Sequence, residues 1–138
     1  MRSSKWMVWT LLGAVLIVAT AGSAVPVNAA RSVTQLRTKL SGGAIDGLTP
    51  SGHAKFRERG TARRFNAEVE DVNLAPGTVL HVFVNTIAVG TITLSGAPVR
   101  GGELELNTHD GDAVIDMNKG DMVTVTDPAG NPILSGTF

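Results

Sequence analysis

The stretch from residue 78 to 94, TVLHVFVNTIAVGTITL, is the most apolar part of the chain after its N-terminus. It is rich in β-branched residues, and Asn85-Thr86 interrupts it, which predicts two strands joined by a tight turn. Both faces of this hairpin are apolar, as expected for strands inside a sheet rather than at its edge. The predicted cross-strand pairs are Val84–Ile87, Phe83–Ala88, Val82–Val89, His81–Gly90, Leu80–Thr91 and Val79–Ile92.

A second hairpin is predicted over residues 53–74, with Gly60-Thr61 at its tip, because glycine in the first turn position suits a type II′ turn. Its predicted apolar pairs are Phe56–Phe65 and Ala54–Ala67, and its predicted polar pairs are His53–Glu68, Lys55–Asn66 and Arg57–Arg64. A slip of one residue would mix the two sets, so the pattern specifies this register. The apolar parity changes after Val69, which predicts a bulge or bend near Glu70-Asp71.

A third hairpin is predicted over residues 103–117, because Asp110-Gly111 is the strongest short turn signal in the chain. The predicted pairs here are Leu106–Ile115, Leu104–Met117 and Glu105–Asp116.

Alternation also predicts a half-buried first strand over residues 33–40 and a closing pair of strands over 122–126 and 132–138. The turn between the closing strands is Asp127-Pro128-Ala129-Gly130. Because Pro132 cannot donate to a ladder, the last strand is expected to begin there or to lie at an edge. No helical period follows residue 29. The chain therefore predicts an all-β fold of about eight antiparallel strands built from hairpins, a sandwich or closed barrel, after an N-terminal signal helix.

The first 29 residues have the pattern of a secretory signal peptide. Arg2 and Lys5 form a basic start, residues 6–21 are apolar, and the small residues at 27–29 resemble a cleavage site. An uncleaved membrane anchor is the alternative, but the apolar run is short for crossing a bilayer. We therefore expect a signal peptide over residues 1–29, a single β-sandwich domain over residues 30–138, and a secreted or periplasmic location. Disulfides are excluded because the chain has no cysteine.

Charge is distributed unevenly along the chain. Residues 30–64 carry eight Lys/Arg against two Asp/Glu, and residues 65–138 carry two against ten. The two halves can neutralise each other across neighbouring strands, and the small net charge of residues 30–138 does not indicate nucleic acid or anionic membranes as partners. Tyrosine is absent and both tryptophans precede residue 10, so only phenylalanine could stack on nucleobases or sugar rings.

The first candidate site is a basic strip of Lys55, Arg57 and Arg64 on the polar side of the second hairpin, extended by Arg37 and Lys39. Arg57 opposite Arg64 is unfavourable unless an anion or a carboxylate lies between them. A phosphate, a sulfated or teichoic-type polymer, or an acidic protein surface could supply the anion. Glu68 or Glu70 of the same domain could also supply it.

The second candidate is a calcium site at the third hairpin, formed by Glu105, Asp110, Asp112 and Asp116, because calcium prefers several carboxylate oxygens. The spacing does not match the calcium-binding loop of EF-hands, and a plain solvated hairpin explains the same residues. Calcium is the only cofactor that the sequence suggests.

Catalytic motifs are missing from the sequence. It has no Gly-x-Ser-x-Gly, no cysteine nucleophile, no phosphate-binding glycine loop and no His-Glu-x-x-His. The three histidines fall in different predicted hairpins, and nothing places them together as a zinc site. A spatially assembled catalytic site, as in a small hydrolase, stays an alternative because sequence does not reveal such sites.

Three segments resemble known proteins: LSGGAIDGLTPSGHAKF, FNAEVEDVNLAPGTVL and the closing GNPILSGTF. Together they resemble a group of small secreted bacterial β-proteins without an assigned activity, and they are distantly similar to chordin-type domains. The family's central His-x-His is reduced here to His81, so a metal role attached to that pair is not implied. The resemblance implies a β-sandwich or barrel.

From these observations we expect a non-catalytic binding or structural module of the cell envelope. Its expected partner is an envelope protein or an anionic polymer, which would contact the outward faces of the hairpins at 53–68 and 103–117. A calcium-stabilised extracellular domain is the alternative. The oligomeric state does not follow from the sequence.

Overall fold

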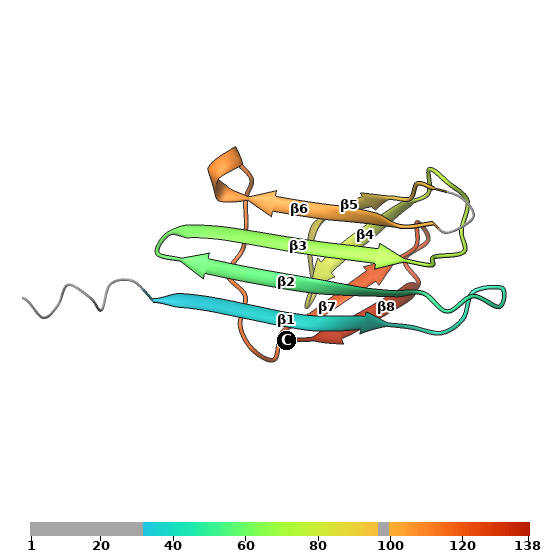
Figure 1. The fold of residues 1–138 in the computed structure, drawn as a ribbon, viewed down its shortest axis with the longest axis horizontal. Coiled ribbons are helices and arrows are strands. Elements are labelled where there is room, and N and C mark those ends of the chain that lie inside the picture. The colour runs from blue at the N-terminus through green and yellow to red at the C-terminus, as the bar shows by residue number, and fades with distance from the viewer. Residues whose placement is uncertain (1–31, 97–99) are drawn as a thin grey trace, which may run out of the picture. The chain divides into compact units, whose positions relative to one another are not determined.

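Alternating buried and exposed residues build eight antiparallel strands in the part of the chain that the computed structural model describes, residues 32–96 and 100–138 (Figure 1). The strands are β1 (Val33–Ser41), β2 (Ser51–Arg59), β3 (Ala62–Glu70), β4 (Val79–Val84), β5 (Ile87–Thr93), β6 (Gly102–Asn107), β7 (Met122–Thr126) and β8 (Pro132–Thr137), with a short 3₁₀ helix η3 (Thr108–Asp110) after β6. The predicted signal segment, residues 1–29, lies outside the described residues.

The strands form one sheet in the order β5-β4-β7-β8-β1-β2-β3-β6. The terminal strands approach each other where Ser95 and Gly101 exchange two backbone hydrogen bonds, of 3.0 and 3.1 Å. The sheet is therefore nearly closed into a barrel, with β1, β2, β3 and β6 on one side and β4, β5, β7 and β8 on the other (Figure 1). The all-β prediction is confirmed, and of the two architectures left open the structure shows the barrel-like one.

One hydrophobic core fills the space between the two sides. Phe56 and Phe65 are its largest fully buried side chains, and both are 0% exposed. The other buried apolar residues come from every strand except β6 and from the loops, and they include Leu40, Val72, Leu80, Ile92, Val125 and Leu134. From Val33 to Phe138 the chain forms a single compact unit around this core.

The predicted register of β2 and β3 is confirmed over the whole hairpin. Phe56 pairs with Phe65, Arg57 with Arg64 and Ser51 with Glu70, without a bulge. The predicted bend after the strand is also present, because β3 ends at Glu70 and Asp71 takes a left-handed backbone with φ of 56°. That bend lets Val72 enter the core.

The register predicted for β4 and β5 is correct only near the turn. Val84 pairs with Ile87, but a β-bulge between Val82 and Phe83 then shifts the register by one residue, so Val82 faces Gly90 rather than Val89. The bulge turns Ile92 into the core, where it faces Leu80. Burial of Ile92 therefore overrides the uniform register.

The prediction that this hairpin lies inside the sheet is correct for one strand only. β4 lies between β5 and β7, whereas β5 is a terminal strand of the sheet. As expected for a strand at an edge, Ile87 is 53% exposed. His81 faces Thr91 rather than the predicted Gly90.

The predicted third hairpin is wrong. β6 pairs with β3, and the chain after η3 does not return along β6. The side chain of Asn107 accepts a hydrogen bond from the His109 N–H, the Asp112 carboxylate accepts one from the Asn107 N–H, and Gly111 ends the 3₁₀ turn with φ of 91°. These local side-chain bonds compete with the hairpin turn, so Asp110-Gly111 ends a helical turn instead.

Residues 112–121, which we call the strap, connect β6 to β7 across one end of the barrel (Figure 1). No regular secondary structure forms in the strap. Its two buried side chains, Val114 and Met117, belong to the hydrophobic core. Burial of these two residues, three positions apart, holds the strap against the strands and removes Asp116 from its predicted place opposite Glu105.

The closing strand pair is confirmed, and β8 begins at Pro132 as predicted. In its turn the carboxylate of Asp127 accepts hydrogen bonds from the N–H groups of Ala129 and Asn131, each of 2.9 Å, and from the side-chain amide of Asn131. The bonds from Asn131 are the main reason that the pKa of Asp127 lies below its ordinary value. The charged carboxylate therefore stabilises the turn.

The replacement Asp127→Asn is expected to lower the melting temperature at neutral pH and to flatten its acid dependence. Because the folded-state pKa of Asp127 is depressed, its contribution is present above the ordinary aspartate pKa of 3.8 and is lost as pH falls through the folded-state value. Thermal melts from about pH 5 to about pH 2 should show a larger loss for the wild type than for the variant. Equal losses would contradict this role.

Close backbone approach joins β8 to β1. A Cβ added to Gly136 would overlap the carbonyl oxygen of Lys39, and one added to Gly42 would overlap that of Ile133. Only glycine permits this approach, which completes the sheet at the pair Ser41–Ser135.

Gly136→Ala is therefore expected to destabilise the fold by about 1–3 kcal/mol, as overpacking does elsewhere. Gly43→Ala is the matched control, because a Cβ at Gly43 would meet no atom within 4 Å, and we expect a change within about 0.5 kcal/mol. Chemical denaturation of both variants measures the difference. Equal stabilities would show that the β1–β8 contact tolerates a side chain.

Candidate functional site

Charged residues are separated between the two sides of the barrel. β4, β5, β7 and β8 contain no Asp, Glu, Lys or Arg. All charged residues within the described strands therefore lie on β1, β2, β3 and β6. Because side chains alternate along a strand and the apolar ones point inward, nearly all of these charges lie on one outer face.

The basic strip predicted from the sequence is assembled on this face. Arg57 lies directly opposite Arg64, and Lys55 lies opposite Arg37 of β1. Among the described residues, no carboxylate oxygen lies within 4.0 Å of the cationic groups of these four side chains. Like charges held opposite each other on neighbouring strands repel, so an added anion would relieve the repulsion.

Acidic and amide side chains border the strip on β3 and β6. Glu68 forms a 3.1 Å contact with His53, and Glu103 accepts a hydrogen bond from the side chain of Asn66. Glu105 follows on β6, opposite Asn66. Contacts between the two halves of the sequence occur at His53–Glu68 and at Arg63–Asp116, while no carboxylate of the described residues pairs with the basic strip within 4.0 Å.

Two shallow grooves run over this face. The larger one has a volume of about 830 Å³ and lies over β1 and β2, where Arg37, Lys39, His53 and Lys55 line it and Glu70 lies at one end. The smaller one has a volume of about 320 Å³ and is lined by Arg57, Arg64, Glu103 and Glu105, among others. Arg37 and Lys55 line both grooves, so the two are neighbours on the basic strip.

The four predicted calcium ligands are separated. Glu105 lies on the outer face of β6, Asp110 is exposed in η3, Asp112 accepts the Asn107 N–H at 2.9 Å, and Asp116 lies 3.9 Å from the guanidinium of Arg63. Within residues 32–96 and 100–138, no three His, Asp or Glu side chains come together as a possible metal site. Calcium binding therefore stays a prediction, and the described structure does not bring its four proposed ligands together.

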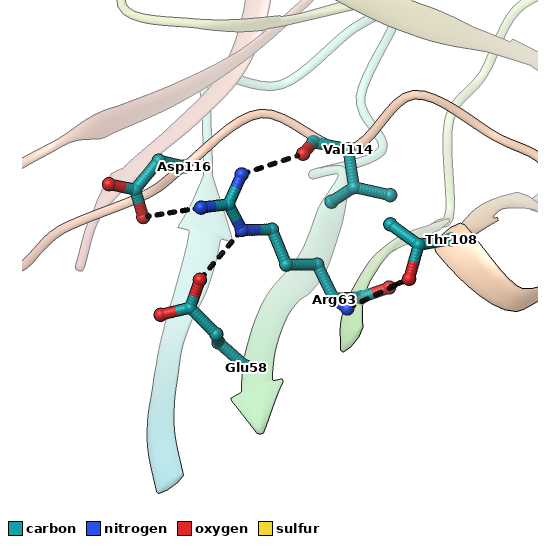
Figure 2. Close-up of polar contacts among 5 residues, drawn as sticks. All are labelled: Glu58, Arg63, Thr108, Val114 and Asp116. Carbon is teal, nitrogen blue, oxygen red and sulfur yellow. Dashed lines mark hydrogen bonds and ion pairs between the residues drawn. The ribbon is translucent and has the colours of Figure 1, made fainter. Parts of the chain in front are cut away.

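Arg63 is a polar centre that the sequence did not single out. Its Nε donates a 2.6 Å hydrogen bond to Glu58, and its Nη1 donates a 3.3 Å bond to the carbonyl oxygen of Val114 in the strap (Figure 2). The Arg63 N–H also donates to the hydroxyl of Thr108, at 3.0 Å, and that hydroxyl donates back to the Arg63 carbonyl. Arg63 therefore joins the β2–β3 hairpin to η3 and to the strap.

The hydrogen bond to Glu58 and its negative charge raise the pKa of Arg63, and Asp116 adds a smaller effect in the same direction. A signal for this pair is present in the sequence. The confirmed register places Glu58 opposite Arg63 on the side of Phe56 and Phe65, so a charged pair lies on an otherwise apolar face at the hairpin tip. Such a pair needs polar partners, and the strap supplies them.

Replacing Arg63 by Met keeps most of the side-chain stem and removes the hydrogen bonds to the strap and Glu58. We expect the strap to open more often, so that trypsin cleaves after Lys119 several-fold faster than in the wild type. Arg57→Met is the control, because its side chain makes no contact with the strap in the described structure. Mass spectrometry of the digests over time measures the cleavage rate after Lys119. Equal rates in the Arg63→Met and Arg57→Met variants would refute the role of Arg63.

Comparison with protein-family models, with curated proteins and with solved structures finds no match for this chain. The resemblance to chordin-type domains therefore stays a prediction. In the described part of the chain, helices long and apolar enough to cross a membrane are not found.

Proposed function

We propose that this protein is a secreted or periplasmic, non-catalytic binding module that holds an anionic partner on the outer face of β1, β2 and β3. The observation that carries the proposal is the pair Arg57–Arg64, two guanidinium groups held opposite each other with no carboxylate oxygen of the described residues within 4.0 Å. The sheet fixes the backbone positions of both residues before any ligand arrives. A fixed array of cations is a suitable surface for an extended anion.

From the sequence alone, Glu68 or Glu70 of the same domain could neutralise Arg57 and Arg64. Glu68 could have neutralised the pair, but it contacts His53 instead. Glu70 lies at the opposite end of the β2–β3 hairpin, where it pairs with Ser51. Glu103 and Glu105 line the same groove as the pair, but neither carboxylate lies within 4.0 Å of Arg57 or Arg64. An external anion is therefore the proposed partner for the two arginines.

Secretion is part of the proposal because residues 1–29 have the composition of a signal peptide. An envelope protein or an anionic polymer is the proposed partner. Of the two hairpins whose outward faces are predicted to contact the partner, the structure contains the one at 53–68. Residues 103–117 do not form a hairpin. Glu103 and Glu105 lie on β6, on the same outer face as the basic strip.

Binding of fluorescent poly(glycerol phosphate), heparin and poly-L-glutamate to residues 30–138 tests the proposal. We expect at least one of these polyanions to bind at low salt, and its affinity to fall on the order of tenfold or more when salt rises from about 0.05 M to about 0.5 M. The double variant Arg57→Ser/Arg64→Ser should lose most of this binding.

The control compares two variants that each remove one positive charge, Lys119→Ser and Arg57→Ser. Lys119 is exposed in the turn before β7, on a segment that does not line either groove. Lys119→Ser should therefore bind almost as well as the wild type, whereas Arg57→Ser should bind clearly less. Equal effects of the two variants, or no binding of any polyanion, would disprove an anion site on this face.

A further inference from the structure

The cations on the outer face form a ladder along β1 and β2. The confirmed pairings place them in four successive rows, each separated from the next by two strand residues. The rows are Arg59; Arg57 with Arg64; Lys55 with Arg37; and Lys39, which lies opposite His53, itself in contact with Glu68. We call this array the cationic lane.

Strand geometry sets the spacing of the lane. A strand rises about 3.3 Å per residue, so successive rows lie about 6.6 Å apart and the four rows span about 20 Å. The two grooves cover the three rows from Arg57 to Lys39 and share Arg37 and Lys55. A ligand that uses the whole lane must therefore be extended and must carry anions at a regular spacing.

The lane has a direction, because acidic side chains limit it. On the β3 and β6 side, Glu68, Glu103 and Glu105 face the same surface. On the β8 side the neighbouring strand has no charged residue. An anion lying across the strands would meet the carboxylates of β6, so the favourable path runs along β1 and β2.

The chemistry of the lane also limits the class of ligand. Most of its outward side chains are cationic or amide groups, with one carboxylate, that of Glu68, and it presents no Phe, Tyr or Trp. Protein interfaces depend on buried aromatic and apolar anchors, and nucleobases and sugar rings stack on aromatic side chains. In the lane, Val33 and Ala62 at the hairpin tip are the only apolar residues of the outward rows. The lane therefore recognises charge and spacing rather than a surface or a ring.

We propose that the cationic lane binds a linear polymer of phosphodiester-linked units, stretched along β1 and β2 with about one phosphate for each row. The proposal rests on the proposed function and adds the ligand class and its direction. Arginine donates two parallel hydrogen bonds to phosphate oxygens, which suits the row where Arg57 faces Arg64. An extended glycerol-phosphate unit has a length similar to the ~6.6 Å between rows.

The experiment uses glycerol-phosphate oligomers of increasing length with residues 30–138 at low salt. We expect affinity to rise by a constant factor for each added phosphate and to level off near the fourth, because the lane has four rows. Arg59→Ser and Lys39→Ser, at opposite ends of the lane, should each weaken the long oligomers several-fold and leave the shortest oligomer almost unchanged. Lys119→Ser should leave the affinity for every length unchanged.

Different outcomes separate this inference from the proposed function. Binding of all lengths with the same affinity, or no effect of the end variants, would overturn the lane while a local anion site at Arg57 and Arg64 remained. Tighter binding of poly-L-glutamate or heparin than of a phosphate polymer of equal charge would overturn the ligand class. Failure of every polyanion to bind would overturn both.

Discussion

Burial of Phe56 against Phe65 is the constraint on which the rest of the structure depends. The two rings are the largest fully buried side chains, and they fix the register of β2 and β3, because a slip of one residue would put them on opposite faces of the sheet and expose one of them. Side chains alternate, so the same register determines which residues point outward. The unfavourable placement of Arg57 opposite Arg64 is thus enforced by the core, and the fold itself maintains the cationic face.

The two sides of the barrel differ in surface charge, although both contribute to the core. The four uncharged strands supply seven of the seventeen buried residues of the described core, while β1, β2, β3 and β6 combine a largely apolar inner face with a charged outer face. The one charged pair that points inward, Glu58 and Arg63, is used to hold the strap across the barrel end. Core packing and the outer cations are therefore independent, and the outer face can change its charge without loss of the fold.

Local pattern predicted local structure well. The Gly60-Thr61 hairpin, the closing strand pair and the all-β class follow from residues close together in sequence, and so does the basic strip. The pattern failed at two places. A bulge turns Ile92 inward to face Leu80, and at Asp110-Gly111 the local Asp112–Asn107 bond competes with the turn signal and replaces the hairpin. The pairing of β3 with β6, which places acidic residues beside the basic strip, also has no local signal.

The most direct test of the account is to map the ligand on the face by NMR, following backbone amide shifts of residues 30–138 during titration with a glycerol-phosphate oligomer. The account predicts shifts concentrated on β1 and β2 and at Arg64, along the direction of the strands. The uncharged strands β4 and β7 should be unaffected. Shifts centred on β4 and β7, or on the strap, would contradict the assignment of the binding face.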